Sequence, residues 1–440
     1  MEIKTTLEKP YTEEQRIEFI IEQNHRQGYE IRETETGIMR NPFRLKNNPC
    51  KLTDDKAPKI FAIKIYGLKG KGCINDEAEK KCKIIVDKDR TRKVQVGDGL
   101  YAWGELGFSV KANDYMTGTG FTYTPRHLRL YAENKLISDI TIDSFLFKDT
   151  RGLNSFIDYK QWAATREFFM KSFKDTNSPV LFQKSQPNGT FKIDKEKEYK
   201  FRYEVEDDFG NKEHMDFTIT GKKSEISKEE ISKDQIIQCG ESVLFDKGSF
   251  AMQFPQNAIY ENVEHKFYCD TSEKFLSHIY SIGTSSDPLH VFCDISIKIE
   301  QDTIDDKTKY YIAKLNDLNV PSGSAGGTYV NGILVGKTNT FGRFAVTADV
   351  TPPVIAPVHT NKLRNIPYIR LKIYDTQSGI ASYDAYIDNK WVMFEYDSKT
   401  QQITYWLDKK QVQEFKNHTF KLIVKDYCGN VKEYSKQIYW

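Results

Sequence analysis

Residues 201–211, FRYEVEDDFGN, and residues 420–430, FKLIVKDYCGN, carry the same sequence pattern. Each begins as an alternation of apolar and polar residues and ends in Asp, two variable residues and Gly-Asn. Alternation with a period of two predicts a half-buried strand, and the residues that follow it predict a tight reversal of the chain. The chain therefore carries one strand-and-turn unit at two widely separated places.

A second pattern also occurs twice and keeps the same order relative to the first. Residues 108–137 include FSVKANDYMTG and LRLYAENKL, and residues 369–391 include IRLKIYDTQSG and YDAYIDNKW. Both copies again join alternating runs to turn residues. Two patterns repeated in the same order predict two related β-sandwich-like modules. They indicate an architecture and do not by themselves indicate a function.

The composition sets broad limits on the class of protein. A length of 440 residues suggests two to four domains, and an aromatic content of 13% favours strands. The net charge is +2, from 64 Lys and Arg against 62 Asp and Glu, so we expect no nucleic-acid partner. No run of 18 apolar residues predicts a transmembrane helix, and the first residues, MEIKTTLEKPYT, predict no secretory signal.

Changes of pattern along the chain predict its division into domains. Residues 12–27 predict a short helix and residues 28–33 a strand, which together form a short N-terminal α+β segment. Residues 154–176 have apolar residues at helical spacing and predict one helical excursion within the β region. The charged segment 221–234 is typical of a linker, and Pro352-Pro353 predict a stiff boundary.

The sequence therefore predicts a mainly β fold of several β-sandwich, immunoglobulin-like modules in tandem. We expect four units: a segment 1–57, a first module 58–222 that contains the helical excursion, a middle β domain 223–350 and a last immunoglobulin-like module 351–440.

The sequence contains few patterns of catalytic or metal-binding residues. Neither the nucleophile motif GxSxG nor the phosphate-binding motif GxxxxGK[ST] occurs. His290 and Asp294 are the candidate metal ligands, because positions four apart share a face of a regular strand. No third ligand is suggested, and we favour two unrelated strand side chains. None of the seven cysteines forms CxxC; free thiols are favoured over a Cys73–Cys82 disulfide across a hairpin.

Four aspartates at the ends of the repeated strands suggest either calcium ligands or turn caps. They are Asp114, Asp207, Asp375 and Asp426. Each motif supplies one or two carboxylates, whereas a calcium site uses six or more oxygens. We therefore predict that these side chains cap turns through Asx hydrogen bonds. The tryptophans pose a similar choice between a carbohydrate platform and the sandwich cores, and we favour the cores for Trp103, Trp162, Trp391, Trp406 and Trp440.

Residues 147–162, FKDTRGLNSFIDYKQW, carry a resemblance to a known family. The stretch is similar to one in the C-terminal β-rich accessory region of bacterial lysostaphin-like (LytM-type) zinc endopeptidases, as are KANDYMTG, FRYEVEDDFGN and GILVGKTNTFGRFAVTADVTPPVI in type and order. The resemblance covers most of residues 58–440 and implies a location in the cell envelope, in the periplasm or at the cell surface. Its most specific residues are Asp149, Thr150, Arg151, Asn154, Asp158 and Tyr159.

The N-terminal segment resembles the degenerate tail of that family's catalytic domain. Tyr29, Glu30 and Arg32 take the places of Phe, Glu and Arg in the family's His-x-His-Phe-Glu-x-Arg motif, and Arg26 and Gly28 take the places of its two histidines. The family's cofactor is zinc, but neither replacement supplies an imidazole. The resemblance therefore implies a truncated peptidase tail without metal ligands, and we expect no cofactor and no catalysis from this chain as it stands.

We accordingly expect a non-catalytic, envelope-associated binding or scaffold protein derived from a peptidoglycan endopeptidase family, whose partner is a protein or a cell-wall glycan. One alternative is a fragment of an active zinc-dependent peptidoglycan endopeptidase whose catalytic domain lies upstream. Another alternative is a carbohydrate- or protein-adhesion β array that is unrelated to peptidases.

Overall fold

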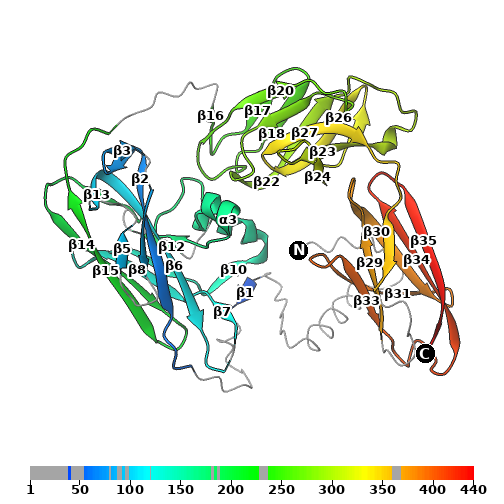
Figure 1. The fold of residues 1–440 in the computed structure, drawn as a ribbon, viewed down its shortest axis with the longest axis horizontal. Coiled ribbons are helices and arrows are strands. Elements are labelled where there is room, and N and C mark those ends of the chain that lie inside the picture. The colour runs from blue at the N-terminus through cyan, green and yellow to red at the C-terminus, as the bar shows by residue number, and fades with distance from the viewer. Residues whose placement is uncertain are drawn as a thin grey trace.

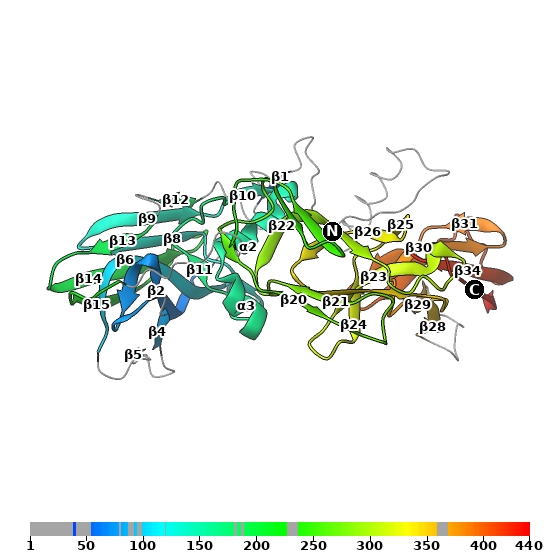
Figure 2. The ribbon, with the colours of Figure 1, turned by 90° about the horizontal axis from the view of Figure 1, so that it is seen from above.

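Three β units follow one another along the chain (Figures 1 and 2). The computed structural model describes residues 38–40, 54–78, 81–86, 92–94, 99–118, 120–179, 183–185, 189–226, 236–358 and 368–440. The predicted mainly β fold with tandem sandwich modules is confirmed. The helix predicted at 12–27 and the strand predicted at 28–33 lie outside the described residues.

The first module is a 13-stranded sheet folded over one core, in the order β12-β9-β8-β14-β15-β6-β2-β4-β5, with β3 paired to β2 and with β7, β11 and β13 paired to β6. A separate pair, β1 with β10, joins the N-terminal segment to this module. The strands are β1 (Ile38–Arg40), β2 (Lys59–Ile74), β3 (Glu77–Ala78), β4 (Lys81–Val86), β5 (Arg92–Val94), β6 (Tyr101–Tyr115), β7 (Thr122–Tyr123), β8 (His127–Ala132), β9 (Lys135–Thr141), β10 (Ser144–Leu146), β11 (Met170–Lys171), β12 (Gln183–Ser185), β13 (Phe191–Ile193), β14 (Glu198–Glu206) and β15 (Lys212–Gly221).

The alternating pattern of residues 201–211 forms β14 and the turn into β15. Phe201 lies opposite Phe217 in the antiparallel register, and their stacked rings have centroids 5.2 Å apart. Phe108 of β6 packs on Phe201 with centroids 5.1 Å apart. Aromatic residues from β6, β14 and β15 therefore build the core of the first module, as their alternation predicts.

The helical excursion is shorter than the predicted 154–176. It consists of the 3₁₀ helix η2 (Phe147–Gly152) and the α-helices α2 (Leu153–Phe156) and α3 (Tyr159–Thr165). Arg166 ends α3 in a left-handed conformation with φ 62°, and Met170–Lys171 then pair with β6 as β11. The prediction was wrong beyond residue 165, because Phe169 and Met170 are buried in the first module. Periodicity alone did not separate short strand residues from a continuing helix.

The middle domain is a sandwich of two five-stranded sheets, β17-β18-β22-β26-β25 and β20-β21-β27-β23-β24, with β16 and β19 as a separate pair. Buried Phe250, Phe254, Phe341 and Phe344 fill the space between the sheets. The strands are β16 (Ile236–Ile237), β17 (Val243–Asp246), β18 (Phe250–Phe254), β19 (Val263–Glu264), β20 (Phe267–Asp270), β21 (Ile279–Ile282), β22 (Pro288–Lys298), β23 (Tyr310–Leu315), β24 (Pro321–Ser324), β25 (Thr328–Val330), β26 (Ile333–Thr340) and β27 (Gly342–Ala348), with the 3₁₀ helix η4 (Lys307–Lys309) before β23.

The last module is a smaller sandwich of two four-stranded sheets, β28-β29-β33-β32 and β31-β30-β34-β35. Its core includes Ile373, Ile403, Phe420 and Leu422. The strands are β28 (Val354–Pro357), β29 (Tyr368–Tyr374), β30 (Ile380–Ile387), β31 (Lys390–Val392), β32 (Glu395–Asp397), β33 (Gln402–Trp406), β34 (Asn417–Asp426) and β35 (Val431–Tyr439).

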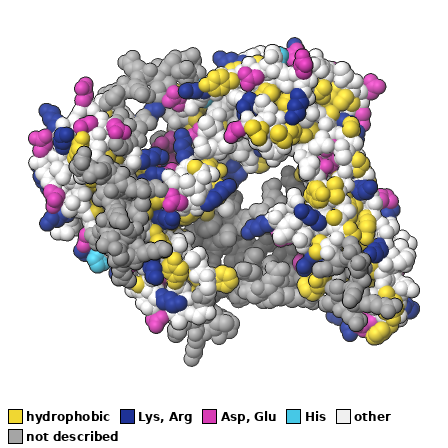
Figure 3. All heavy atoms as spheres, in the orientation of Figure 1, with side chains coloured by type: hydrophobic (Ala, Val, Ile, Leu, Met, Phe, Trp, Pro, Cys, Tyr) yellow, Lys and Arg dark blue, Asp and Glu magenta, His cyan; other side chains and the backbone are white. Residues whose placement is uncertain are grey.

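The surface carries charges of both signs. Figure 3 shows Lys and Arg side chains interspersed with Asp and Glu on the visible face, as the net charge of +2 suggests. Within the described part of the chain, no helix has the length and apolar character needed to cross a membrane.

Candidate functional site

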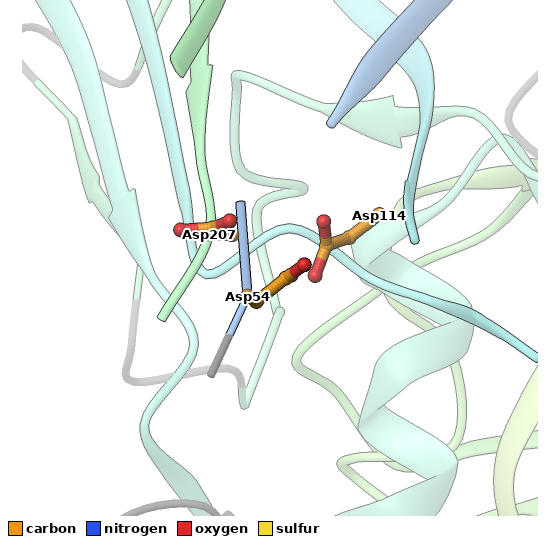
Figure 4. Close-up of side chains that lie close together, drawn as sticks. All are labelled: Asp54, Asp114 and Asp207. Atoms are coloured by element: carbon orange, nitrogen blue, oxygen red, sulfur yellow. The ribbon is translucent and has the colours of Figure 1, made fainter. Parts of the chain in front are cut away.

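The repeated strand-and-turn units bring six aspartates together in two groups of three. The first cluster consists of Asp54, Asp114 and Asp207, and the second cluster of Asp349, Asp375 and Asp426. In each cluster, one carboxylate oxygen from every member lies within 4.8 Å of those from the other two. Figure 4 shows the first cluster, in which Asp54 precedes β2, Asp114 lies near the end of β6 and Asp207 directly follows β14.

Backbone amides of neighbouring turns fix the carboxylates of the first cluster. Asp54 Oδ1 accepts hydrogen bonds from the backbone amides of Lys56 at 3.1 Å and Thr117 at 2.9 Å. Asp207 Oδ1 accepts from the amide of Phe209 at 2.8 Å. Asp54 Oδ2 is buried and has no hydrogen-bond partner. One oxygen of the cluster is therefore withdrawn from water without a donor.

The second cluster is held in the same way at the connection between the middle domain and the last module. Asp349 Oδ1 accepts from the amide of Thr351 at 3.0 Å, and its Oδ2 accepts from the amide of Ser378 at 3.1 Å and the Ser378 hydroxyl at 2.6 Å. Asp375 Oδ1 accepts from the amide of Gly379 at 2.8 Å. Asp349 directly follows β27, so this cluster joins residues of two domains.

An asparagine closes each cluster with the same set of hydrogen bonds. Asn211 Nδ2 donates to the Asp54 carbonyl at 3.1 Å and to Asp207 Oδ2 at 2.7 Å. Asn430 Nδ2 donates to the Asp349 carbonyl at 3.0 Å and to Asp426 Oδ2 at 2.8 Å. The Gly-Asn that ends both repeated patterns therefore ties the third aspartate of each cluster to the backbone of the first.

Three carboxylates of like charge lie close together in each cluster and therefore repel one another. Among the described residues, no Lys, Arg or His forms an ion pair with any of the six aspartates. Burial, aided by the charges of Asp207 and Asp54, raises the pKa of Asp114 to about 6. Burial likewise raises the pKa of Asp426, as do the charges of Asp349 and Asp375. Such crowding of like charges is a feature of cation sites and of carboxyl pairs that share a proton.

The predicted turn caps are confirmed for Asp207, Asp375 and Asp426, whereas Asp114 accepts the amide of the next residue, Tyr115, which closes no turn. The sequence interpretation also missed that the four aspartates converge in two clusters. Asp207 and Asp375 each accept backbone amides of their own turns. Asp426 accepts the amide of Asn430 at 2.8 Å. The missed members were Asp54 and Asp349. A signal for them exists, because each stands a few residues before a proline that opens the first strand of a module, in DDKAP and DVTPP.

The most specific stretch of the family resemblance forms a junction between the first module and the middle domain. Arg151 Nη2 donates to the carbonyl of Leu289 at 2.8 Å and to that of Asn339 at 3.3 Å, and its Nε donates to the carbonyl of His290 at 3.1 Å. The hydroxyl of Tyr260 donates back to the Arg151 carbonyl at 2.6 Å. Arg151 therefore contacts four residues of the middle domain.

Asp158 of the same stretch forms a buried ion pair within the first module. Its Oδ2 lies 2.5 Å from Lys64 Nζ and accepts from the Tyr66 hydroxyl at 3.0 Å, and both charged side chains are buried. Burial would raise the pKa of Asp158, but Lys81 and Lys64 beside it lower the pKa to about 2. Asp158 also caps α3 by accepting the amide of Gln161.

The other residues of the stretch take ordinary positions. Asp149 lies in η2, Thr150 is exposed and Asn154 is half-buried. Tyr159 packs against the core of the first module beside Trp162. The degenerate motif of Arg26, Gly28, Tyr29, Glu30 and Arg32 lies outside the described residues.

His290 and Asp294 do not converge. His290 Nδ1 lies 3.0 Å from the Tyr260 hydroxyl at the junction, whereas Asp294 is exposed near Lys337. A register shift between Pro288 and Cys293 interrupts the regular alternation of β22. Neither residue belongs to a three-membered ligand group within the described ranges.

The predicted free thiol at Cys73 agrees with the structure, and the predicted core positions of the tryptophans agree with it only in part. Cys73 is a buried free thiol, and Cys82 lies opposite Ile65 in the sheet. Trp103, Trp162 and Trp440 pack against module cores, whereas Trp391 is half-buried and donates to Asp384. The core assignment was wrong for Trp406, which is 44% exposed.

Comparison with known proteins identifies one segment. Residues 234–349, about a quarter of the chain, match the family model of the Zu5-like domain. No curated protein matches the sequence. The middle domain is thus similar to a Zu5-like domain, which the sequence analysis did not foresee.

Several solved structures of β-module proteins are distantly similar. The fibronectin(III)-like modules of Clostridium thermocellum CbhA have 8% identity and a TM-score of 0.14, over 76% of this chain and 84% of that one. A 1.5-MDa bacterial ice-binding adhesin has 7% identity and a TM-score of 0.14, over 76% and 90%. Bacteroides ovatus SGBP-B, solved with a mixed-linkage heptasaccharide, has 9% identity and a TM-score of 0.13, over 76% and 63%. Likenesses at this level assign no ligand to the chain.

Proposed function

We propose that this chain is a non-catalytic binding or scaffold protein of the cell envelope, built as a row of β modules held by specific junctions. The observation that carries the proposal is the use of the most specific sequence stretch, residues 147–162. Its Arg151 donates hydrogen bonds to backbone carbonyls of the middle domain, and its Asp158 forms a buried ion pair with Lys64. A side chain that binds backbone carbonyls across domains supports a role in positioning modules.

A second junction supports the same proposal. Lys309 of the middle domain donates to the carbonyl of Cys428 at 3.0 Å and to Asn430 Oδ1 at 2.7 Å in the last module. Buried Tyr311 and Cys428 belong to one small hydrophobic cluster at this place. Both junctions combine hydrogen bonds with buried apolar area, which holds successive modules in a defined relation. The proposal does not need the peptidase relationship, which stays a prediction from sequence.

An exposed aromatic group on the last module favours a carbohydrate as the ligand. Trp406 packs edge-on against Tyr368 with ring centroids 5.0 Å apart, and the Arg370 guanidinium lies 4.6 Å from the Tyr368 ring. Trp406 keeps 44% of its surface exposed, whereas Trp103, Trp162 and Trp440 pack against module cores. An indole face beside hydrogen-bond donors offers the apolar and polar contacts that a sugar ring needs.

The test measures binding and cleavage with the same purified chain. We expect it to sediment with insoluble peptidoglycan or to bind members of a glycan array, and we expect Trp406→Ala to weaken that binding at least tenfold. Tyr268→Ala is the matched control, because Tyr268 is an exposed aromatic residue of the middle domain, 57% exposed. Equal losses in the two variants, or no binding to any glycan, would contradict the carbohydrate assignment. Stoichiometric zinc with peptidoglycan hydrolysis would contradict the non-catalytic role.

A further inference from the structure

We infer that each of the two carboxylate clusters is a binding site for a calcium ion, and that the ion at the second cluster fastens the last module to the middle domain. The inference starts from the near-identity of the two clusters. Three aspartates, a closing asparagine and a Thr or Ser donor recur in both, at Thr117 and at Ser378. The fold thus builds the same acidic arrangement twice.

The second cluster has an independent sign of a missing partner in Tyr311. This residue is 1% exposed, and its hydroxyl has no hydrogen-bond partner. Tyr311 lies opposite Thr347 in the antiparallel pair of β23 and β27, two residues before Asp349. Residues two apart on a strand share a face, so Tyr311 and Asp349 lie on the same side of the sheet.

Tyr311 shares a small buried cluster with Cys428, which lies two residues after Asp426. Burial raises the pKa of Tyr311, and the charges of Asp349 and Asp375 raise it further. A buried hydroxyl without a partner is rare in native proteins, and an ordered water or ion commonly accounts for one. A hydrated cation held by Asp349, Asp375 and Asp426 would give this hydroxyl a water to bind.

The first cluster has its own unsatisfied atom. Asp54 Oδ2 is buried and accepts no hydrogen bond, while its sister oxygen Oδ1 accepts several. A buried carboxylate oxygen without a donor is unfavourable, and a cation shared by the three carboxylates would remove both their repulsion and the missing contact. Asp54 Oδ2 within the first cluster and the Tyr311 hydroxyl beside the second are both buried without a partner, and the same kind of ligand would serve both.

The carboxylate oxygens of both clusters favour calcium over other metal ions. Within the described residues, the members of both clusters are aspartates alone, with no histidine or cysteine in either group. Hard oxygen donors favour calcium or magnesium over zinc. Backbone hydrogen bonds already fix parts of the carboxylates, so the sites are better suited to the irregular, larger coordination sphere of calcium than to a strict magnesium octahedron.

The test uses the full chain after treatment with EDTA and dialysis, with CaCl₂ titrated calorimetrically. We expect two binding events per chain, with a rise in melting temperature. Asp114→Asn removes one of the two half-buried members of the first cluster, and Asp375→Asn removes the half-buried member of the second. We expect each to abolish one event or weaken it at least tenfold. Asp397→Asn is the matched control, because Asp397 caps a turn through Lys399 and lies outside both clusters.

Three results would overturn the inference. The first is that millimolar CaCl₂ gives neither binding heat nor a shift in melting temperature. The second is that the variant with both Asp114→Asn and Asp375→Asn still shows two unchanged binding events. The third is that MgCl₂ binds as tightly as CaCl₂. Tyr311→Phe distinguishes a loss of calcium binding from a loss of folding, because it keeps the buried ring and removes only the hydroxyl. We expect this variant to lower Tb³⁺ emission excited through tyrosine, and to weaken Ca²⁺ binding several-fold at the second cluster alone. Unaltered emission and affinity would remove the link between Tyr311 and the site. These outcomes do not depend on whether the chain binds glycans.

Discussion

The first and last modules share one loop chemistry in two settings. Asn211 ties the backbone of Asp54 to the side chain of Asp207, and Asn430 ties Asp349 to Asp426 with corresponding hydrogen bonds. In the first module, Asp54 belongs to the segment that leads into β2. In the last module, Asp349 directly follows β27 of the middle domain. The same loop therefore organises a strand entry in one module and a domain junction in the other.

The two loops differ in the residues that contact Asn211 and Asn430. Asn430 also accepts a hydrogen bond from Lys309 of the middle domain. The first module instead contacts the middle domain through η2, α2 and α3; Arg151 lies in η2, and Asp158 caps the start of α3. A repeated loop thus acquires its role from its neighbours, and a module that lacks a direct carboxylate junction uses an inserted helical segment for that purpose. Four perturbations separate these two designs.

The largest expected effect comes from the ion pair of Lys64 and Asp158; among the described residues of the last module, no ion pair has both side chains buried. Asp158→Asn removes the carboxylate charge paired with buried Lys64, and breaking a buried pair of this kind costs about 3–5 kcal/mol of unfolding free energy. We expect the first module to unfold at lower temperature while the last module is unaffected, as measured by hydrogen exchange of each module during heating. In the control, Lys64→Met combined with Asp158→Asn should recover part of the loss. A single transition shared by all modules would contradict this separation.

The two asparagines give the next largest effect and test the comparison directly. Asn430→Ala removes donors to Asp349 and Asp426 and the acceptor for Lys309, so we expect a loss of about 2–3 kcal/mol. Asn211→Ala removes only the two matching donors, and we expect about 1–2 kcal/mol. Thermal melts of both variants, with exchange rates assigned to each module, measure the difference. Equal losses would show that the contact with Lys309 adds nothing to the junction.

The sequence predicted the sandwiches because local patterns determine them. Alternation fixed β14 and β34, and the Gly-Asn turns fixed where these strands end. The Asx bonds of Asp207 and Asp375 were also predictable, since donor and acceptor lie within five residues of each other. Hydrogen bonds between residues so close in sequence can be predicted from the local sequence alone.

The convergence of the aspartates depends on long-range pairing and was not predictable in the same way. Asp54 meets Asp207 only because β2, β6, β15 and β14 are neighbours in the sheet. The role of Arg151 needs the position of Leu289, in a different domain. A single sequence shows which residues repeat, whereas the partner of each repeat follows from the topology.

Acid provides a smaller effect that should be confined to the first module's ion pair. The pKa of Asp158, lowered to about 2 by Lys81 and Lys64 against the effect of burial, lies below its unfolded value. A lowered pKa stabilises the fold above the unfolded pKa, and this contribution is lost as the pH falls through about 2. We expect about 2 kcal/mol of the difference between the wild type and Asp158→Asn to vanish between roughly pH 4 and pH 2. A difference that stays constant over this range would contradict the ionised pair.

The smallest expected effect concerns the junction and not the stability of a module. Arg151→Lys keeps the charge but replaces two donor nitrogens that reach three carbonyls with one ammonium group. We expect a loss of about 1–2 kcal/mol in the contact between the first module and the middle domain, since the planar fork cannot be reproduced. Small-angle X-ray scattering should show a broader distribution of intramolecular distances, with the melting of each module unchanged. Arg202→Lys is the control, because Arg202 pairs with Asp216 on the exposed surface. Scattering of Arg151→Lys that matches this control would mean that packed apolar side chains hold the first junction, and that only the carboxylate junction of the last module depends on its polar contacts.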